Sequence, residues 1–177
     1  MSMSKSIPFI VTFLFALPAF AGDVSFGPND VKSVFYIARS VDPNQVVYGI
    51  RLDAHCNPVG DEALFPYWNE MRPPRTHGLG MLEWIPYGFS EQRVVHRTTT
   101  GGTELVRLKQ LDRLITITTK REDDGRCSAH AYARIGNVDH AEVTDVFVQQ
   151  SGPTSVDWVD IHAKDASGNA IVERIRH

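Results

Sequence analysis

The sequence predicts an all-β domain, because short strand-like runs recur along the chain and helical periodicity appears only once. About ten runs rich in β-branched and aromatic residues follow one another at spacings near a dozen residues. Glycine, proline, asparagine and aspartate cluster between these runs as turn signals. Parallel strands would need long crossover helices, which the pattern lacks. We therefore expect a single antiparallel β-sandwich or barrel-like domain of about ten short strands with one short helix.

Three of the runs precede the expected helix. Runs 34–39 and 46–52 are separated by the turn residues Asp42, Pro43 and Asn44, which is typical of a hairpin whose loop is slightly longer than two residues. The third run, 64–68, contains a proline, which has no N–H to donate to a neighbouring strand. We expect this run at a sheet edge or a bulge.

The one helical signal covers residues 79–87. Leu82 and Ile85 are spaced by three positions, and Pro86 and Gly88 are residues that end helices. The sequence therefore predicts a single short helix or helical turn in this segment.

Sequence runs typical of β-strands resume after the helix and continue to the end of the chain. The remaining runs are 92–99, 104–108, 114–119, 128–135, 141–149, 156–163 and 170–175. Asp124-Gly125 and Gly136-Asn137 predict tight hairpin turns before two of them. Residues 167–169 join the last pair.

The N-terminus has the pattern of a secretory signal peptide. Lys5 precedes an apolar stretch over residues 7–20, and Ala19-Phe20-Ala21 provides small residues for cleavage. The stretch is shorter than the roughly 20 residues that a membrane-spanning helix needs. We expect residues 1–21 to be the signal peptide and residues 22–177 to be the domain, periplasmic or extracellular and without a membrane anchor.

The charge balance excludes nucleic acid as the main partner. The chain has 18 basic and 21 acidic residues, a formal net charge of −3, and both signs are scattered along it. Nucleic acids and anionic membranes select for clustered lysine and arginine. We expect no cofactor.

Cys56 and Cys127 are the only two cysteines. In an exported protein the first interpretation is a disulfide bond, which would close a loop of about 70 residues and add roughly 4 kcal/mol. Buried free thiols and intermolecular pairing are the alternatives. Zinc needs two more ligands, and only His55 and His130 lie near the cysteines.

The sequence contains no strong catalytic or metal-binding motif. Asp160 and His162 share one face of a predicted strand and could bind a metal with His130, but a solvated or hydrogen-bonded polar face is the favoured interpretation, and we predict no metal site. A glycoside hydrolase would need two acid–base carboxylates. These could come from the glutamates in the middle of the chain, Glu62, Glu70, Glu83 and Glu91.

An aromatic and polar cluster in the middle third is the candidate ligand-binding surface. Tyrosine and tryptophan combine apolar area with a hydrogen-bonding tip, so they suit recognition of sugars, peptides or lipids. The commoner explanation for such a cluster is that the side chains cap the open end of the barrel or sandwich as part of the core. The candidate residues are Tyr67, Trp68, His77, Glu83, Trp84 and Tyr87.

Several segments together resemble the domain-of-unknown-function family DUF4833. They are residues 33–40 (SVFYIARS), 44–48 (NQVVY), 66–68 (PYW), 87–88 (YG) and 168–173 (GNAIVE). The resemblance covers nearly all of the predicted mature chain. One departure is Trp84, which follows Glu83 where the family usually has a basic residue. The resemblance implies no activity and no catalytic residues.

The leading hypothesis is therefore an exported, non-enzymatic binding or interaction domain whose partner is a ligand or protein of the cell envelope. A hydrolase acting on envelope material is the alternative. A structural interaction partner with an exposed edge strand is a third possibility.

Overall fold

The computed structural model describes residues 31–111, 113–152 and 155–176. The predicted signal peptide, residues 1–21, lies outside the described residues. Within the described ranges, no helix is long and apolar enough to cross a membrane.

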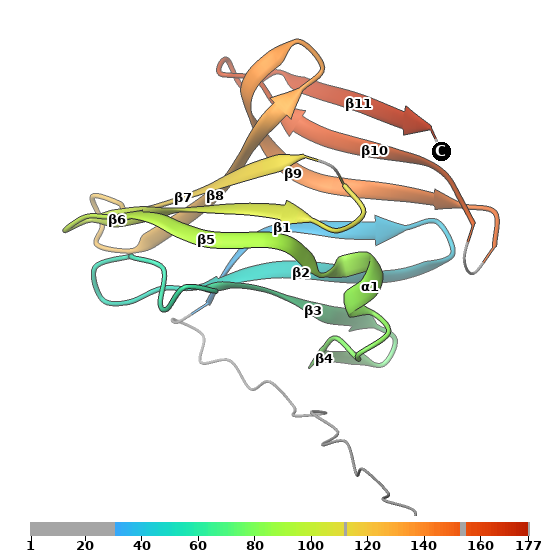
Figure 1. Ribbon diagram of the computed structural model, residues 1–177, viewed down its shortest axis with the longest axis horizontal. Coiled ribbons are helices and arrows are strands. Elements are labelled where there is room, and N and C mark those ends of the chain that lie inside the picture. The colour runs from blue at the N-terminus through green and yellow to red at the C-terminus, as the bar shows by residue number, and fades with distance from the viewer. Residues whose placement is uncertain (1–30, 112, 153–154, 177) are drawn as a thin grey trace, which may run out of the picture.

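The all-β class with one short helix is confirmed, with eleven strands in the described residues (Figure 1). The elements are β1 (Val31–Arg39), β2 (Asp42–Arg51), β3 (Leu64–Met71), β4 (Pro74–Gly78), α1 (Trp84–Tyr87), β5 (Phe89–Arg97), β6 (Gly101–Leu108), β7 (Leu114–Arg121), β8 (Cys127–Ile135), β9 (Val138–Gln150), β10 (Val156–Lys164) and β11 (Ala170–Arg176).

Two local predictions need correction. The additional strand is β4, which pairs with β3 although its sequence, Pro-Arg-Thr-His-Gly, has no strand character. The helix occupies only Trp84–Tyr87, whereas the periodicity indicated residues 79–87. The preceding residues form turns, including the hydrogen bond from the Glu83 N–H to the Gly80 carbonyl. Pro86 accounts for the short length, since a proline interrupts the hydrogen bonding of a helix.

All the strands belong to one curled, open sheet. Its order is β4-β3-β2-β1-β9-β8-β7-β6-β5, and β10 pairs with both β9 and β11. Within the described residues the end strands β4 and β5 have one neighbour each and do not pair with one another. The β1–β4 arm and the β5–β8 arm face one another, joined through β9 (Figure 1).

The long strand β9 is where the sheet divides. Its first half pairs with β8 and its second half with β1, while β10 runs along the opposite edge. The division coincides with an irregularity: Val143 and Asp145 pair with successive residues of β10, so Thr144 is an extra, bulged residue. A bulge bends a strand and increases its twist, which suits the change of partner at this point.

The pairing of β1 with β9 is parallel, which corrects the expectation of a purely antiparallel sheet. Tyr36 pairs with Asp145 and Arg39 with Val148. A parallel pair needs a crossover connection, and here that connection consists of the strands β2 to β8 rather than of a helix.

The core lies between the two arms. It contains fully buried Tyr48 and Ile50 from β2 and Val106 and Ile117 from the opposite arm. The ring of Tyr48 contacts Phe89 of β5 edge to face, with centroids 5.9 Å apart. These contacts hold the arms in a fixed relationship, and the apolar side chains that the strands direct inward supply most of the stabilisation.

The predicted disulfide bond is confirmed. Cys56, in the loop after β2, is bonded to Cys127 at the start of β8, with an S–S distance of 2.01 Å. Beside it, the Thr119 hydroxyl donates to the Cys56 carbonyl at 2.7 Å and accepts from the Gly102 N–H. The disulfide therefore joins the two arms at the end of the sheet where β6 begins.

Candidate functional site

A cavity of about 610 Å³ lies at the other end of β6, between the two arms. It is bounded by β1, β3, the end of β6, the segment that follows it, β9, β10 and the segment of α1. Eight aliphatic side chains line it: Ile37, Leu82, Leu108, Leu111, Val146, Val148, Val156 and Val159. Its other lining residues are Arg39, Trp68, Glu83, Pro86, Tyr87, Gln110 and Gln150.

Strand alternation explains why the cavity is apolar inside and polar at one end. On β9 the inward positions Val146 and Val148 are followed by Gln150, and on β1 the inward position Ile37 is followed by Arg39. Every second residue of a strand faces the same side. Each of these two strands therefore contributes apolar side chains and then one polar side chain at its carboxyl end.

Arg39 is fixed by three neighbours at this polar end. One terminal nitrogen, Nη2, donates to Asp42 Oδ2 at 2.5 Å, and Nη1 donates to the Tyr87 hydroxyl at 3.4 Å. The guanidinium carbon lies 4.7 Å from the centroid of the Trp68 ring, a cation–π contact. The guanidinium is therefore held beside the indole.

Tyr87 joins the helical segment to the core. Its ring contacts Trp68 edge to face with centroids 5.6 Å apart, and its carbonyl accepts a 2.9 Å hydrogen bond from the buried Tyr48 hydroxyl. Burial raises the pKa of the Tyr87 hydroxyl, and the neighbouring Arg39 partly offsets this effect. The hydroxyl is consequently neutral at physiological pH and can donate a hydrogen bond.

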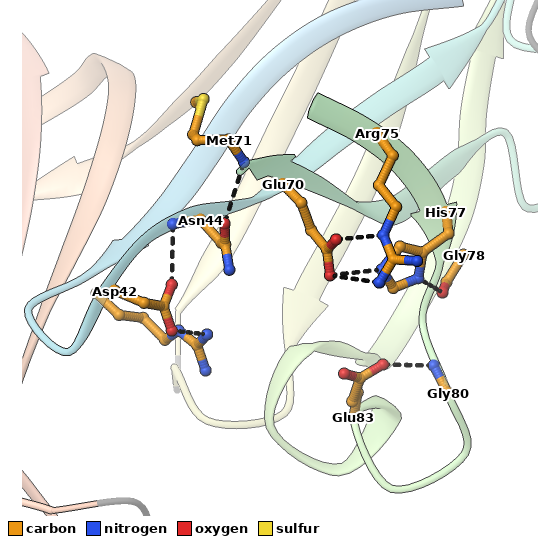
Figure 2. A network of polar contacts seen from close by, with 10 residues as sticks. Asp42, Asn44, Glu70, Met71, Arg75, His77, Gly78, Gly80 and Glu83 are labelled. Carbon is orange, nitrogen blue, oxygen red and sulfur yellow. Dashed lines mark hydrogen bonds and ion pairs between the residues drawn. The ribbon is translucent and has the colours of Figure 1, made fainter. Parts of the chain in front are cut away.

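The segment around α1 forms one wall of the cavity and continues onto the surface. The Glu83 carboxylate accepts a 2.6 Å hydrogen bond from the Gly80 N–H, which closes the turn before the helix (Figure 2). Leu82 lines the cavity although 75% of its surface is exposed, and Met81 and Ile85 beside it are also exposed. The apolar lining is thus continuous with an apolar surface.

Three cavity-lining residues have a buried polar atom without a hydrogen-bond partner among the described residues. These atoms are the Arg39 Nε, the Trp68 Nε1 and the Gln150 Oε1. Buried polar groups are normally paired because the loss of hydration costs free energy. All three residues line the same cavity, and a few polar groups among apolar walls are typical of a ligand site.

Three of the six predicted binding residues line the cavity and three do not. Trp68, Glu83 and Tyr87 line it. Tyr67 lies on the opposite face of β3, with its ring 5.9 Å from Phe65. The other two, His77 and Trp84, do not line the cavity and have contacts elsewhere.

His77 belongs to a charged cluster on the β3–β4 hairpin (Figure 2). Its Nε2 lies 3.2 Å from Glu70 Oε1, and Arg75 also bonds the Glu70 carboxylate. The hydrogen bonds from Arg75 and then His77 lower the pKa of Glu70 to about 2. The cluster therefore holds Glu70 as a carboxylate and joins β4 to β3.

Trp84 packs against the start of β5 rather than into the cavity. Its ring centroid is 6.2 Å from that of Phe89, and the side chain is partly exposed. Trp84 also fills the space beside Gly88, where an added Cβ would lie 2.5 Å from the indole. Its position supports the turn between α1 and β5.

The residues considered for metal binding are engaged in separate pairs. His130 contacts Glu142 at 2.7 Å, His162 contacts Asp145 at 2.6 Å, and Asp160 forms a two-bond ion pair with Arg174. No group of three or more candidate metal ligands exists within residues 31–111, 113–152 and 155–176.

The carboxylates considered for hydrolysis do not meet at the cavity. Of Glu62, Glu70, Glu83 and Glu91, only Glu83 lines it. Glu70 is held by Arg75, and Glu91 lies near Arg93 and Arg107. The pair that an acid–base mechanism requires is therefore not assembled there.

The family model described as a domain of unknown function, DUF4833, matches residues 35–174. The chain belongs to the DUF4833 family. The matched region begins in β1 and ends in β11, so every cavity-lining residue of this DUF4833 domain lies within it. No curated protein and no solved structure matches the chain.

The sequence predicted only three of the cavity-lining residues, Trp68, Glu83 and Tyr87. Arg39, Val146, Val148, Gln150 and Val159 come from strands far from the aromatic cluster in the sequence. One signal was readable: Gln150 is polar at a position where the alternation of Val146 and Val148 calls for an apolar side chain.

Proposed function

We propose that this DUF4833 domain is an exported binding protein for a small, predominantly apolar molecule held in the cavity between its two arms. The observation that carries the proposal is the lining, in which eight aliphatic side chains surround a space of about 610 Å³. Ligand pockets typically have volumes of roughly 300 to 1,000 Å³ and predominantly apolar walls with a few polar groups. In this proposal the curled sheet acts as an open barrel whose end admits the ligand.

Export agrees with this role. The Cys56–Cys127 bond is of the kind that persists in an oxidising compartment, and residues 1–21 have the pattern of a signal peptide. The ligand would therefore be a molecule of the periplasm or the cell surface. The proposal requires no nucleic acid, membrane anchor or cofactor.

The affinity expected for such a ligand is modest. Removing apolar surface from water yields about 25 cal/mol per Å², and the loss of ligand freedom offsets part of that gain. A ligand that buries on the order of 300 Å² gains about 7.5 kcal/mol before this offset, so its Kd would lie in the high micromolar to millimolar range. This range is accessible to fluorescence titration.

The neutral dye N-phenyl-1-naphthylamine tests the proposal, because its emission rises in apolar surroundings. We expect saturable enhancement with the oxidised wild-type protein. Val148→Trp and Val156→Trp place bulk in the cavity from two strands and should weaken dye binding at least about tenfold. Val95→Trp is the matched control, because Val95 is exposed on β5 and does not line the cavity.

The dye-binding results either support or overturn the proposal. Saturable binding that both cavity-filling variants lose and Val95→Trp retains supports the proposal. Absence of saturable enhancement with the folded wild type overturns it. Equal dye affinity in the wild type and both folded variants would place the dye elsewhere and also overturn it.

A further inference from the structure

We infer that the ligand is an amphiphile with an acidic head, of the type of an alkyl monocarboxylate, whose head is bound by Arg39 and Trp68. This inference rests on the proposed function, since it concerns the occupant of the same cavity. Three features carry it: buried unpartnered hydrogen-bond donors at the polar end, a guanidinium with uncommitted donors, and a row of apolar side chains behind them.

The polar end of the cavity offers mainly donors. Trp68 is 5% exposed, and its Nε1 has no partner in the described part of the chain. The Arg39 Nε is likewise buried and unpartnered, and the Tyr87 hydroxyl, which accepts from Arg39, still has its own proton to donate. Among the buried unpartnered atoms of the lining residues that the structure describes, the one acceptor is the Gln150 Oε1. An acceptor-rich head satisfies this set.

The donors that Arg39 leaves uncommitted favour a ligand with an acidic head. Arg39 and Glu83 are the two charged residues that line the cavity. The Glu83 Oε2 already accepts from the Gly80 N–H, whereas Arg39 commits Nη2 to Asp42 and forms only a long contact through Nη1. A guanidinium has five N–H donors and binds a carboxylate through two of them. Arg39 can therefore bind a ligand carboxylate while keeping its contact with Asp42.

The contact with Trp68 orients the Arg39 guanidinium before a ligand binds. Stacking at 4.7 Å restricts the guanidinium to one orientation, and a donor group that is already oriented loses less entropy when the ligand binds. The apolar body of the ligand then follows the row formed by Ile37 on β1 and Val146 and Val148 on β9. Head and tail sites are thus ordered along the same two strands.

Three probes of equal chain length test the head: decanoate, decanol and decylamine, each below its micellar concentration. Displacement of N-phenyl-1-naphthylamine should give decanoate an affinity at least about tenfold higher than that of decanol, with decylamine the weakest. Arg39→Gln should weaken decanoate binding more than decanol binding and bring the two affinities within about twofold of each other. Arg93→Gln is the control, because Arg93 is an exposed arginine of β5 outside the cavity.

Trp68→Phe provides a second variant that keeps an aromatic ring in the core and removes only the indole donor. It should weaken decanoate binding several-fold more than decanol binding. If the dye and all three probes bind wild type equally well, the proposed function stands and the inference about the head is wrong. If neither the dye nor any probe binds, the proposed function itself fails.

Discussion

Arg39 stacks on Trp68 with its guanidinium carbon 4.7 Å from the ring centroid, which joins the carboxyl end of β1 to the inner face of β3. The two residues are neighbours because β2 lies between their strands and all three side-chain rows face the same interior. The contact lies at the polar end of the cavity, which both residues line. It also brings together two cavity-lining side chains that have unpartnered buried donors.

The hydrogen bond between Tyr48 and Tyr87 predicts a coupling between the core and the helical wall of the cavity. Tyr48→Phe removes the 2.9 Å bond from the buried hydroxyl to the Tyr87 carbonyl. We expect the free energy of unfolding to fall by about 1 kcal/mol and amide exchange to accelerate over residues 83–88. Tyr132→Phe, on the outer face of β8, is the control. Unchanged exchange in the α1 segment would contradict the coupling.

The disulfide predicts a large loss of stability when it is removed. Cys56 and Cys127 are 71 residues apart, and a crosslink of this span stabilises by about 4 kcal/mol in the chain-entropy description. The double variant Cys56→Ser/Cys127→Ser should lose most of this amount in urea unfolding. Reduced wild type should match the variant. A loss below about 1 kcal/mol would show that the packing of the arms suffices without the bond.

Buried Glu104 predicts that stability falls as pH rises. Burial raises the pKa of its carboxyl, and the hydrogen bonds from Gln92 and the Leu64 N–H offset this only in part. The folded state therefore binds the proton more tightly than the unfolded state. The free energy of unfolding is then highest below the unfolded pKa of about 4.3 and declines as pH rises through the raised folded value.

Glu104→Gln removes this titration. The variant should gain stability relative to wild type as pH rises from about 4 to about 8, measured by urea unfolding at each pH. Glu62→Gln, at an exposed position, should follow the wild-type curve. If the free energy of unfolding depends on pH in the same way for wild type and Glu104→Gln, then ionisation of Glu104 does not destabilise the folded state.

The ion pair between Arg113 and Glu173 predicts the opposite pH dependence at the β11 edge. Two hydrogen bonds of 2.5 and 2.9 Å join the side chains, and the Gly136 N–H also donates to the carboxylate. These contacts, that of Arg113 foremost, lower the pKa of Glu173. The stabilisation is present above the unfolded pKa of about 4.3 and is lost as pH falls through the lowered folded value.

Replacing Glu173 with glutamine should cost about 1 to 2 kcal/mol at neutral pH and nothing once the wild-type carboxylate is protonated. Thermal unfolding across the acid range measures both regimes. The exposed pair of Glu91 and Arg93 is the comparison, since surface ion pairs contribute little. An equal effect of Glu91→Gln would mean that the Arg113 contact has no special role.

Local chemistry made part of the fold predictable. The alternating runs predicted the all-β class, and two cysteines in a chain expected to be exported predicted the Cys56–Cys127 bond. The strand β4 was not predictable, because Pro74–Gly78 pairs through its backbone and has no apolar alternation. The parallel pairing of β1 with β9 joins residues about a hundred positions apart, and neither strand has a local signal for its partner.

The site was predictable only where its residues cluster in sequence. Trp68, Glu83 and Tyr87 line the cavity because β3 and the α1 segment lie side by side. Tyr67 shows the limit of a composition argument: it is adjacent to Trp68, but strand alternation directs it to the other face. Arg39 was not recognised because its role depends on contacts with Trp68 and Tyr87, which only the folded sheet creates.

A crystal structure of the oxidised protein with decanoate tests the central claim most directly. We predict density for the alkyl chain beside Val146 and Val148, with the carboxylate within hydrogen-bond distance of Arg39 or the Trp68 Nε1. A binding-competent protein whose cavity stays empty while decanoate occupies another surface would contradict the account.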